Sequence, residues 1–310
     1  MHADFHPASL RASLQPFTGE QSESAEVQAY RKFYALQFEQ ARQTRIGTLR
    51  VADYELVVQA WWPAQPRASL VLLHGYYDHV GLYGHLIEWA LGMGFVVLTV
   101  DLPGHGLSTG EVASIRDFAE YQAVLTGLLG IAQQLQLPQP WHLCGQSTGA
   151  AILIDYLLRG APLPQIGESI LLAPLVRPRA WWRSRLSYRL LKPFVSSIPR
   201  HFYANSNNAA FVDFVRADDP LQARTLPVAW VGALARWIPL IEAAPASRRS
   251  LLIVQGDDDL TVDWQHNLAL LNAKFNQPRL CLLKTGRHHL VNETPQLRRR
   301  YLGFLAQHLS

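Results

Sequence analysis

The chain has 310 residues, of which 49% are hydrophobic and 17% are charged. A chain of this composition can bury a large core, which excludes intrinsic disorder for its main body. The net charge of +4 is too small over this length to indicate a nucleic-acid-binding protein. The two cysteines, Cys144 and Cys281, exclude a disulfide framework and a cysteine-based zinc site. No segment resembles a signal peptide or the roughly 18-residue apolar run of a membrane span, so we expect a cytoplasmic protein.

The N-terminal part of the chain shows three different patterns. Residues 1–25 are polar and aperiodic, and we expect them to form a poorly ordered arm. Residues 27–42 carry aromatic and apolar side chains at helical spacing, which predicts a helix. Two β-rich runs, 45–51 and 54–62, are separated by a short turn and predict a hairpin.

Beyond the hairpin, short apolar runs alternate with helical segments. The runs fit strands buried on both faces, as in a parallel sheet, and lie at 70–73, 95–100, 141–144, 170–172, 251–254 and 280–283. Helices are predicted at 82–91, 114–135, 148–158, 262–275 and 295–308. The second of these begins with a capping-box-like pair, Ser114 and Asp117. The alternation predicts an α/β protein with a mostly parallel, doubly wound sheet.

One segment interrupts the alternation of strands and helices. Residues 176–250 contain several Trp, Pro and Arg residues but no clear strand pattern, so we expect a mostly helical insertion after the sixth strand. The predicted organisation is therefore an N-terminal arm over 1–25, a core made of residues 26–175 and 251–310, and the insertion between the two parts of the core.

The segment Gly145-Gln146-Ser147-Thr148-Gly149 follows a predicted strand and opens a predicted helix. This is the context of the G-x-S-x-G nucleophile elbow, in which a serine occupies the apex of a sharp, strained turn. The glycines leave room for strand and helix to approach closely. Ser147 is therefore a candidate nucleophile, and the alternative is an ordinary serine in a glycine-rich turn.

A serine hydroxyl is a weak nucleophile and needs a base that is oriented by an acid. On an α/β scaffold the acid and then the histidine follow the serine in the chain, each after a later strand. The strand predicted at 280–283 leads to His288 and His289, and we favour His288. The strand predicted at 251–254 leads to three adjacent acids, of which we favour the third: Asp257, Asp258 and Asp259.

Attack by a serine on a carbonyl group creates a tetrahedral intermediate, whose negative oxygen needs two backbone N–H donors. One should come from Thr148, directly after the nucleophile, and the other from Tyr76, in the loop after the strand at 70–73. His74 and His79 precede the serine, so we expect them to shape this loop and not to act as bases. The sequence contains no metal-binding or nucleotide-binding motif, and no cofactor is predicted.

Together these motifs resemble the α/β-hydrolase superfamily and, more narrowly, the bacterial lysophospholipase and monoacylglycerol lipase group, also called serine aminopeptidase-like hydrolases. The matching positions extend from residue 70 to 295 and comprise His74-Gly75, Asp78-His79, Tyr83, Asp101, Gly104-His105-Gly106-Leu107-Ser108, Gly110, Ser147, Gly256-x-x-Asp259-x-x-Val262 and Arg287-His288-x-Leu290-x-Asn292-Glu293. The family spacing selects Asp259 and His288 as the partners of Ser147. The chain departs from the family at Gln146, where histidine is usual, and at Ala150, where glycine is common.

The resemblance implies that the insertion, residues 176–250, is a cap over the active site. Its part from 177 to 200 has seven basic and no acidic residues. Four aromatic residues lie among them: Trp181, Trp182, Tyr188 and Phe194. The whole insertion carries a net charge of +8 and the rest of the chain −4. Such a segment suits an anionic membrane surface or a phosphate-bearing head group, and the alternative is a solvated helix whose aromatic residues pack on the core.

The resemblance further implies a serine hydrolase that cleaves carboxylic esters of lipids, such as lysophospholipids or monoacylglycerols, through an acyl-enzyme. The expected partners are a lipid ester and an anionic membrane, contacted peripherally through the basic cap, and no nucleic acid. One alternative is an aminopeptidase, which would need carboxylates in the cap to bind a substrate ammonium, whereas this cap has 4 acidic residues. The other is a non-catalytic binding protein of the same fold, which would not need an intact Ser, His and Asp set.

Overall fold

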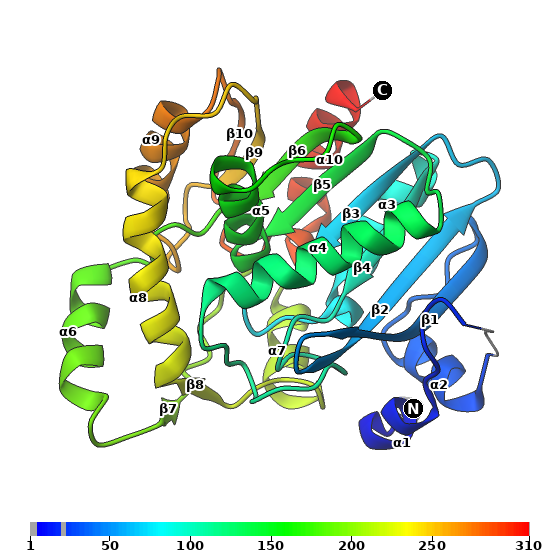
Figure 1. The fold of residues 1–310 in the computed structure, drawn as a ribbon, viewed down its shortest axis with the longest axis horizontal. Coiled ribbons are helices and arrows are strands. Elements are labelled where there is room, and N and C mark those ends of the chain that lie inside the picture. The colour runs from blue at the N-terminus through cyan, green and yellow to red at the C-terminus, as the bar shows by residue number, and fades with distance from the viewer. Residues whose placement is uncertain (1–4, 20–22, 310) are drawn as a thin grey trace.

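The structure is a computed structural model that describes residues 5–19 and 23–309. Within these residues, an eight-stranded sheet has the spatial order β1-β2-β4-β3-β5-β6-β9-β10 (Figure 1). Its strands are β1 (Ala41–Val51), β2 (Tyr54–Pro63), β3 (Ala68–Leu73), β4 (Phe95–Val100), β5 (Trp141–Gln146), β6 (Ile166–Leu172), β9 (Leu252–Gly256) and β10 (Arg279–Leu283). Strands β1 and β2 form the predicted antiparallel hairpin, β2 pairs antiparallel with β4, and the other pairings are parallel. The predicted mostly parallel sheet is confirmed.

Helices cover both faces of this sheet. They are α1 (Pro7–Ser13), α2 (Ala25–Phe33), α3 (Gly84–Gly92), α4 (Phe118–Gln134), α5 (Thr148–Arg159), α9 (Trp264–Lys274) and α10 (Pro295–His308), with short 3-10 turns at Val80–Tyr83 and Leu290–Asn292. Side chains of α4, α5 and α9 share one hydrophobic cluster, whereas those of α3 and α10 share another. Along β3, Val71 and Leu73 belong to the first cluster, and Leu70 and Leu72 belong to the second. Burial on both faces explains why these strands read as uninterrupted apolar runs.

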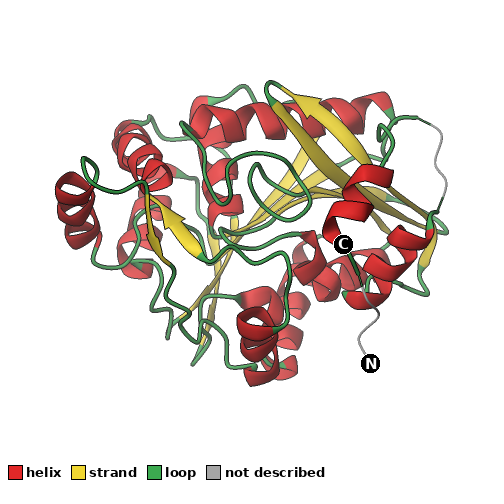
Figure 2. Ribbon diagram, turned by 90° about the horizontal axis from the view of Figure 1, so that it is seen from below, coloured by secondary structure: helices red, strands yellow, loops and turns green. Residues whose placement is uncertain are grey.

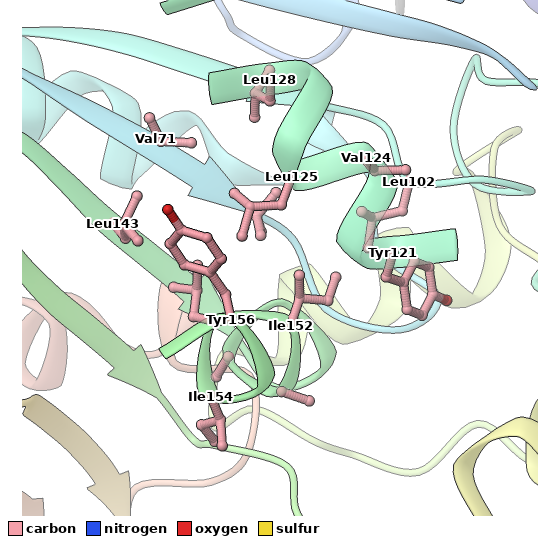
Figure 3. Close-up of a cluster of buried hydrophobic side chains, with 14 of the residues drawn as sticks. Val71, Leu102, Tyr121, Val124, Leu125, Leu128, Leu143, Ile152, Ile154 and Tyr156 are labelled. Atoms are coloured by element: carbon pink, nitrogen blue, oxygen red, sulfur yellow. The ribbon is translucent and has the colours of Figure 1, made fainter. Parts of the chain in front are cut away.

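The larger core lies between the sheet and helices α4 and α5. In Figure 3, Leu125 of α4 and Ile152 of α5 point toward Val71 of β3 and Leu143 of β5. All four side chains are completely buried. Truncating a leucine in such a site to alanine typically costs about 2–5 kcal/mol, so this layer holds the central strands firmly under the loops at their carboxyl ends.

The insertion between β6 and β9 contains helices and a short ribbon. Its elements are α6 (Trp181–Leu191), β7 (Ser197–Pro199), α7 (Ala209–Ala217), β8 (Thr225–Pro227) and α8 (Val228–Ala243). Strands β7 and β8 pair with each other in an antiparallel ribbon that is separate from the main sheet (Figure 2). The sequence does not predict this ribbon, because strands of three residues are too short to show a period.

The described residues of the N-terminal segment do not form the poorly ordered arm that was expected. Residues 7–13 form α1, and the side chains of Phe5, Leu10 and Phe17 are buried. The Phe17 N–H group donates a hydrogen bond to Thr48 O over 2.8 Å, which ties the segment to β1. Scattered apolar side chains give no periodic signal, although tertiary packing buries them. Residues 1–4 and 20–22 of the expected arm lie outside the described residues.

Two predicted helix boundaries are wrong for local reasons. The helix predicted over 27–42 ends at Phe33, because Ala35 adopts a left-handed φ of 51° and the Leu36 N–H group bonds back to Arg31 O. The helix predicted from Ser114 begins at Phe118, and Asp117 caps it by accepting a hydrogen bond from the Ala119 N–H group.

Candidate active site

Ser147 lies between β5 and α5 at the carboxyl edge of the sheet. Its backbone angles, φ 52° and ψ −106°, are unusual for any residue with a side chain, as expected for the apex of a strained turn. The Ser147 N–H group donates to Leu172 O of β6 over 2.8 Å, and the Ser147 carbonyl accepts from the Ala151 N–H group over 3.0 Å. Both neighbouring elements therefore hold the serine in this conformation.

Glycines on either side of the serine permit the turn. A Cβ atom on Gly145 would lie 2.3 Å from the carbonyl carbon of Gly149, and one on Gly149 would lie 2.2 Å from Leu73 O of β3. The obstructing atoms belong to the backbone, so they cannot swing away as the end of a flexible side chain can. The beginning of α5 is therefore pressed against both β5 and β3.

The side chain of His288 bridges Ser147 and Asp259. His288 Nε2 lies 2.9 Å from Ser147 Oγ, and His288 Nδ1 lies 2.8 Å from Asp259 Oδ2. The second oxygen of Asp259 accepts hydrogen bonds from the Thr261 and Val262 N–H groups, at 2.8 and 3.1 Å. The three side chains follow β5, β9 and β10, so the parallel sheet brings together residues that are far apart in the chain.

The charges and burial of Asp259 and His288 determine where the protons lie in the group of Ser147, His288 and Asp259. Burial opposes ionisation of Asp259, but the neighbouring His288 and the hydrogen bonds from Thr261 and Gln255 together hold the pKa of Asp259 below its usual value. Burial alone lowers the pKa of His288, but the charge and the hydrogen bond of Asp259, together with the charge of Asp78, leave the pKa raised. An ionised Asp259 can only accept a hydrogen bond, so Nδ1 of His288 carries a proton. In neutral His288, Nε2 is then free to accept the proton of Ser147.

The alternative acids and base have other partners. Asp257 accepts a hydrogen bond from the Thr285 N–H group over 2.6 Å, and Asp258 lies 3.5 Å from Arg287 Nε. His289 Nε2 lies 3.1 Å from Asp78 Oδ1.

The two early histidines are buried in the loops around the site. His74 Nδ1 bonds to Gly75 O, and its Nε2 accepts a hydrogen bond from the Leu102 N–H group. Burial lowers the pKa of His74 to about 3, which keeps the ring neutral at physiological pH. His79 Nε2 lies 2.9 Å from Asp219 Oδ2, in the insertion. This link between loop and insertion has no signal in the sequence.

The loop after β3 is a tight turn in which the Asp78 N–H group bonds to Gly75 O and Tyr77 has a left-handed φ of 68°. The Tyr76 ring stacks on Trp230 of α8 with 3.8 Å between ring centroids, and the Tyr76 hydroxyl donates to Ala113 O. Thr148 is the first residue of α5, where an N–H group has no carbonyl of its own helix to pair with.

Ser147, His288, Tyr76 and Thr148 line one cavity of about 340 Å³. Much of the remaining wall comes from the insertion and includes Pro178, Ile198, Arg200, Phe211, Leu226 and Trp230. Sequence analysis missed these residues, because no local motif shows which side chains of an insertion face the strand ends. Within the described residues, no group of three or more His, Cys, Asp or Glu side chains could hold a metal ion.

Residues 64–295 match the model of a family described as serine aminopeptidase, S33. The chain belongs to this family, within the α/β-hydrolase superfamily. A monoacylglycerol lipase of Mycolicibacterium smegmatis is 27% identical over 79% of this chain and 90% of its own length. Phospholipase YtpA of Bacillus subtilis is 26% identical over 70% of this chain and 88% of its own.

Solved structures agree on the fold. A monoglyceride lipase from Saccharomyces cerevisiae, in complex with a substrate analogue, has a TM-score of 0.72 and 16% identity, covering 85% of this chain and 94% of that one. A monoacylglycerol lipase from Paleococcus ferrophilus has a TM-score of 0.67 and 20% identity, covering 82% and 99%.

We predict that Gly149→Ala strongly destabilises the protein, because its Cβ atom would meet the backbone of β3. Overpacking of this kind typically costs about 1–3 kcal/mol or more. Gly130→Ala is the matched control, since Gly130 lies inside α4 and its Cβ atom would meet nothing within 4 Å. That control should be neutral or stabilising by up to about 1 kcal/mol. Urea unfolding of both variants measures the difference, and equal stabilities would contradict the close approach of α5 and β3.

Proposed function

We propose that this chain is a serine hydrolase that cleaves carboxylic esters of lipids through an acyl-enzyme, with Ser147, His288 and Asp259 as its triad. The observation that carries the proposal is the hydrogen-bonded series from Asp259 through His288 to Ser147 beside a cavity. The names of the relatives, monoacylglycerol lipase and phospholipase, support a lipid ester as the substrate class.

In the proposed reaction, Ser147 Oγ attacks the ester carbonyl while His288 Nε2 takes its proton. His288 returns this proton to the oxygen of the leaving alcohol, which departs and leaves the acyl group on the serine. Water then attacks the acyl carbon while His288 takes one of its protons. The bond to Ser147 Oγ breaks, His288 returns the proton to Oγ, and the fatty acid leaves. Asp259 orients the imidazole and stabilises its charged form throughout.

The proposed oxyanion hole consists of the N–H groups of Tyr76 and Thr148. Both residues line the cavity beside Ser147. The stacking of Tyr76 on Trp230 supports this role, since donors held rigidly need no rearrangement when the negative charge develops.

A mostly apolar chamber supports a substrate with an acyl chain. This second cavity, of about 350 Å³, lies among α6, α8 and the β7–β8 ribbon, and its wall also includes Arg183, Ser184 and Ser187. It shares four apolar wall residues with the cavity at Ser147: Pro178, Ile198, Leu226 and Trp230. We therefore assign residues 176–250 the role of a cap whose apolar interior takes the acyl chain.

The cavity at Ser147 supports aminopeptidase activity less well than ester hydrolysis. Recognition of a substrate ammonium needs a free carboxylate, and the carboxylate in this wall is Asp78. Asp78 already accepts a hydrogen bond from the Tyr83 hydroxyl over 2.8 Å and lies beside His289. The cavity also contains a cation, Arg200, which would repel an ammonium group.

We further propose that α6 docks the enzyme on an anionic membrane. Trp182, Leu186 and Leu190 recur at every fourth residue of α6 and are 69%, 52% and 62% exposed, and Phe194 beyond the helix is 82% exposed. Basic residues lie among them: Arg183, Arg185, Arg189 and Lys192. This pattern suits a helix that inserts apolar side chains at a lipid interface while its cations meet anionic head groups.

The surface differs in one respect from what the sequence suggests. Trp181 is only 9% exposed and packs in the core, so Trp182 is the tryptophan that can reach lipid. None of the described helices has both the length and the hydropathy needed to cross a bilayer.

Ser147→Ala should lower lipid ester turnover by about 10³- to 10⁶-fold, because it removes the nucleophile and leaves only the oxyanion hole and binding effects. His288→Ala and Asp259→Asn should each be severely impaired, and Ser147→Ala/His288→Ala should be little worse than Ser147→Ala alone. Asp258→Asn is the matched control and should retain most activity. A fluorophosphonate probe should label Ser147 in the wild type, and labelling of a different serine would refute the assignment.

The pH dependence of kcat/KM should report the pKa of His288, which the charge of Asp259 raises. The base must be neutral to accept a proton, so kcat/KM should rise with pH through a pKa above the usual value of histidine. Asp259→Asn removes the charge that raises this pKa, while burial still lowers it, so the acidic limb of the residual activity should move to lower pH. Asp258→Asn should leave the limb in place. An unchanged limb in Asp259→Asn would show that Asp259 does not act on the base.

Binding to anionic vesicles should depend on the exposed side chains of α6. Replacing Arg183, Arg185 and Arg189 with Gln should weaken binding by about fivefold per arginine, and added salt should reduce this difference. Trp182→Ala should weaken binding in a way that salt hardly changes. Trp181→Ala is the control and should instead lower the melting temperature. Co-sedimentation with neutral and anionic vesicles measures this, and equal, salt-independent binding to both would disprove electrostatic docking.

A further inference from the structure

A single guanidinium group lies in the wall of the catalytic cavity. Among the described residues that line this cavity, Arg200 is the one Lys or Arg side chain. It follows β7 in the insertion and is half-buried, unlike the exposed arginines of α6. Its chemistry is therefore available to a molecule bound beside Ser147.

The Arg200 side chain is held in place on several sides. Its guanidinium carbon lies 3.9 Å from the ring centroid of Tyr77 and 4.2 Å from that of Phe202. Its Nη1 atom donates to Gln222 Oε1 over 2.7 Å and to Ala223 O over 3.1 Å. These contacts use both protons of Nη1 and none of those on Nη2 and Nε. The N–H groups of Nη2 and Nε are therefore held in a fixed orientation and can donate to a ligand.

No carboxylate among the described residues lies within ion-pairing distance of Arg200, although half-buried charges usually have partners. Burial lowers the pKa of Arg200, as expected for a cation without a close counter-charge. The carboxylate on the same wall is Asp78, which Tyr83 and His289 already contact. The cavity therefore holds a guanidinium group that no carboxylate pairs directly, although Asp78 lies on the same wall.

A second polar side chain in the wall is only partly satisfied. His289 is 2% exposed, and its Nε2 faces Asp78 Oδ1 at 3.1 Å. Its Nδ1 has no hydrogen-bond partner within the described residues. Nδ1 is therefore the nitrogen that His289 can offer to a polar ligand.

The polar and apolar parts of the cavity wall separate the two halves of an ester. The wall shared with the apolar chamber does not include Arg200, His289 or Asp78. If the acyl chain occupies that chamber, the leaving alcohol is the part of the substrate that meets the polar residues.

We propose that Arg200, with His289 as a second donor, binds a phosphate group on the leaving alcohol. The preferred substrates are then lysophospholipids, in which the acyl group is esterified to a glycerol phosphate, over neutral monoacylglycerols. This inference rests on the proposed ester hydrolase function.

The test compares a monoacylglycerol with the lysophosphatidic acid that carries the same acyl chain. Wild-type enzyme should have a kcat/KM at least about tenfold higher for the phosphate-bearing substrate. Arg200→Gln should lower the ratio of the two kcat/KM values by about 10- to 100-fold, the range for a charge-assisted hydrogen bond. Arg200→Lys keeps the charge but loses the fork, so its ratio should lie between those of the wild type and Arg200→Gln.

Arg224→Gln is the matched control. The guanidinium carbon of Arg224 also lies over the Phe202 ring, 5.1 Å from its centroid, but Arg224 does not line the catalytic cavity. Its substitution should leave the ratio unchanged. Both substrates are presented at low mole fraction in uncharged detergent micelles, so that docking through α6 does not favour one of them. A wild-type ratio of one or less, or an equal effect of Arg200→Gln and Arg224→Gln, would overturn the proposal.

A binding measurement separates this inference from the proposed function. Ser147→Ala protein should bind the lysophosphatidic acid about tenfold or more tightly than the monoacylglycerol, and Ser147→Ala/Arg200→Gln should lose this difference. Inorganic phosphate alone should bind at least about 100-fold more weakly than the lipid, and a comparable affinity would contradict recognition of a lipid head group.

If no ester is hydrolysed but the Arg200-dependent binding remains, the hydrolase proposal fails and the anion site stands. If esters are hydrolysed without Arg200-dependent discrimination, the anion site fails alone.

Discussion

The close approach of α5 to β5 and β3 is the constraint on which the rest of the site depends. It requires glycine at 145 and 149, since a Cβ atom at either position would collide with backbone atoms. Ser147 adopts a positive φ at this turn, and hydrogen bonds to β6 and α5 hold it there. The buried layer of α4 and α5 against the sheet offsets the strain of this turn.

Given this turn, the strand order explains the remaining geometry. Strand β5 lies between β3 and β6, and β9 and β10 continue the sheet beyond β6. All of these strands are parallel, so the loops that carry Tyr76, Asp259 and His288 emerge on the same edge as Ser147. The insertion then closes this edge, in part through contacts with the loop after β3. Trp230 stacks on Tyr76, Arg200 stacks on Tyr77, and Asp219 pairs with His79. The loop proposed to hold the oxyanion is therefore braced by the insertion, not by the core alone.

Features with local or periodic signals could be predicted from the sequence. The elbow is a local motif, and the buried parallel strands are apolar runs, so the fold and the positions of Ser147, Asp259 and His288 at strand ends followed from the pattern. Features that depend on tertiary packing could not be predicted. Phe5, Leu10 and Phe17 are scattered among polar residues, yet they are buried. Trp181 and Trp182 are adjacent in the chain, but one is packed in the core and the other is 69% exposed.

Charge acts differently at two places in the insertion. The arginines of α6 are surrounded by solvent, so their attraction to lipid acts over a distance and weakens as salt screens it. Arg200 is half-buried between two aromatic rings, where screening is weaker and its orientation is set before a ligand arrives. The first arrangement suits a surface that needs only a negative charge density. The second suits one group in one position, because a planar fork distinguishes ligands by geometry as well as by charge. An insertion with a net charge of +8 can therefore contribute both to docking and to substrate selection, with different residues responsible for each.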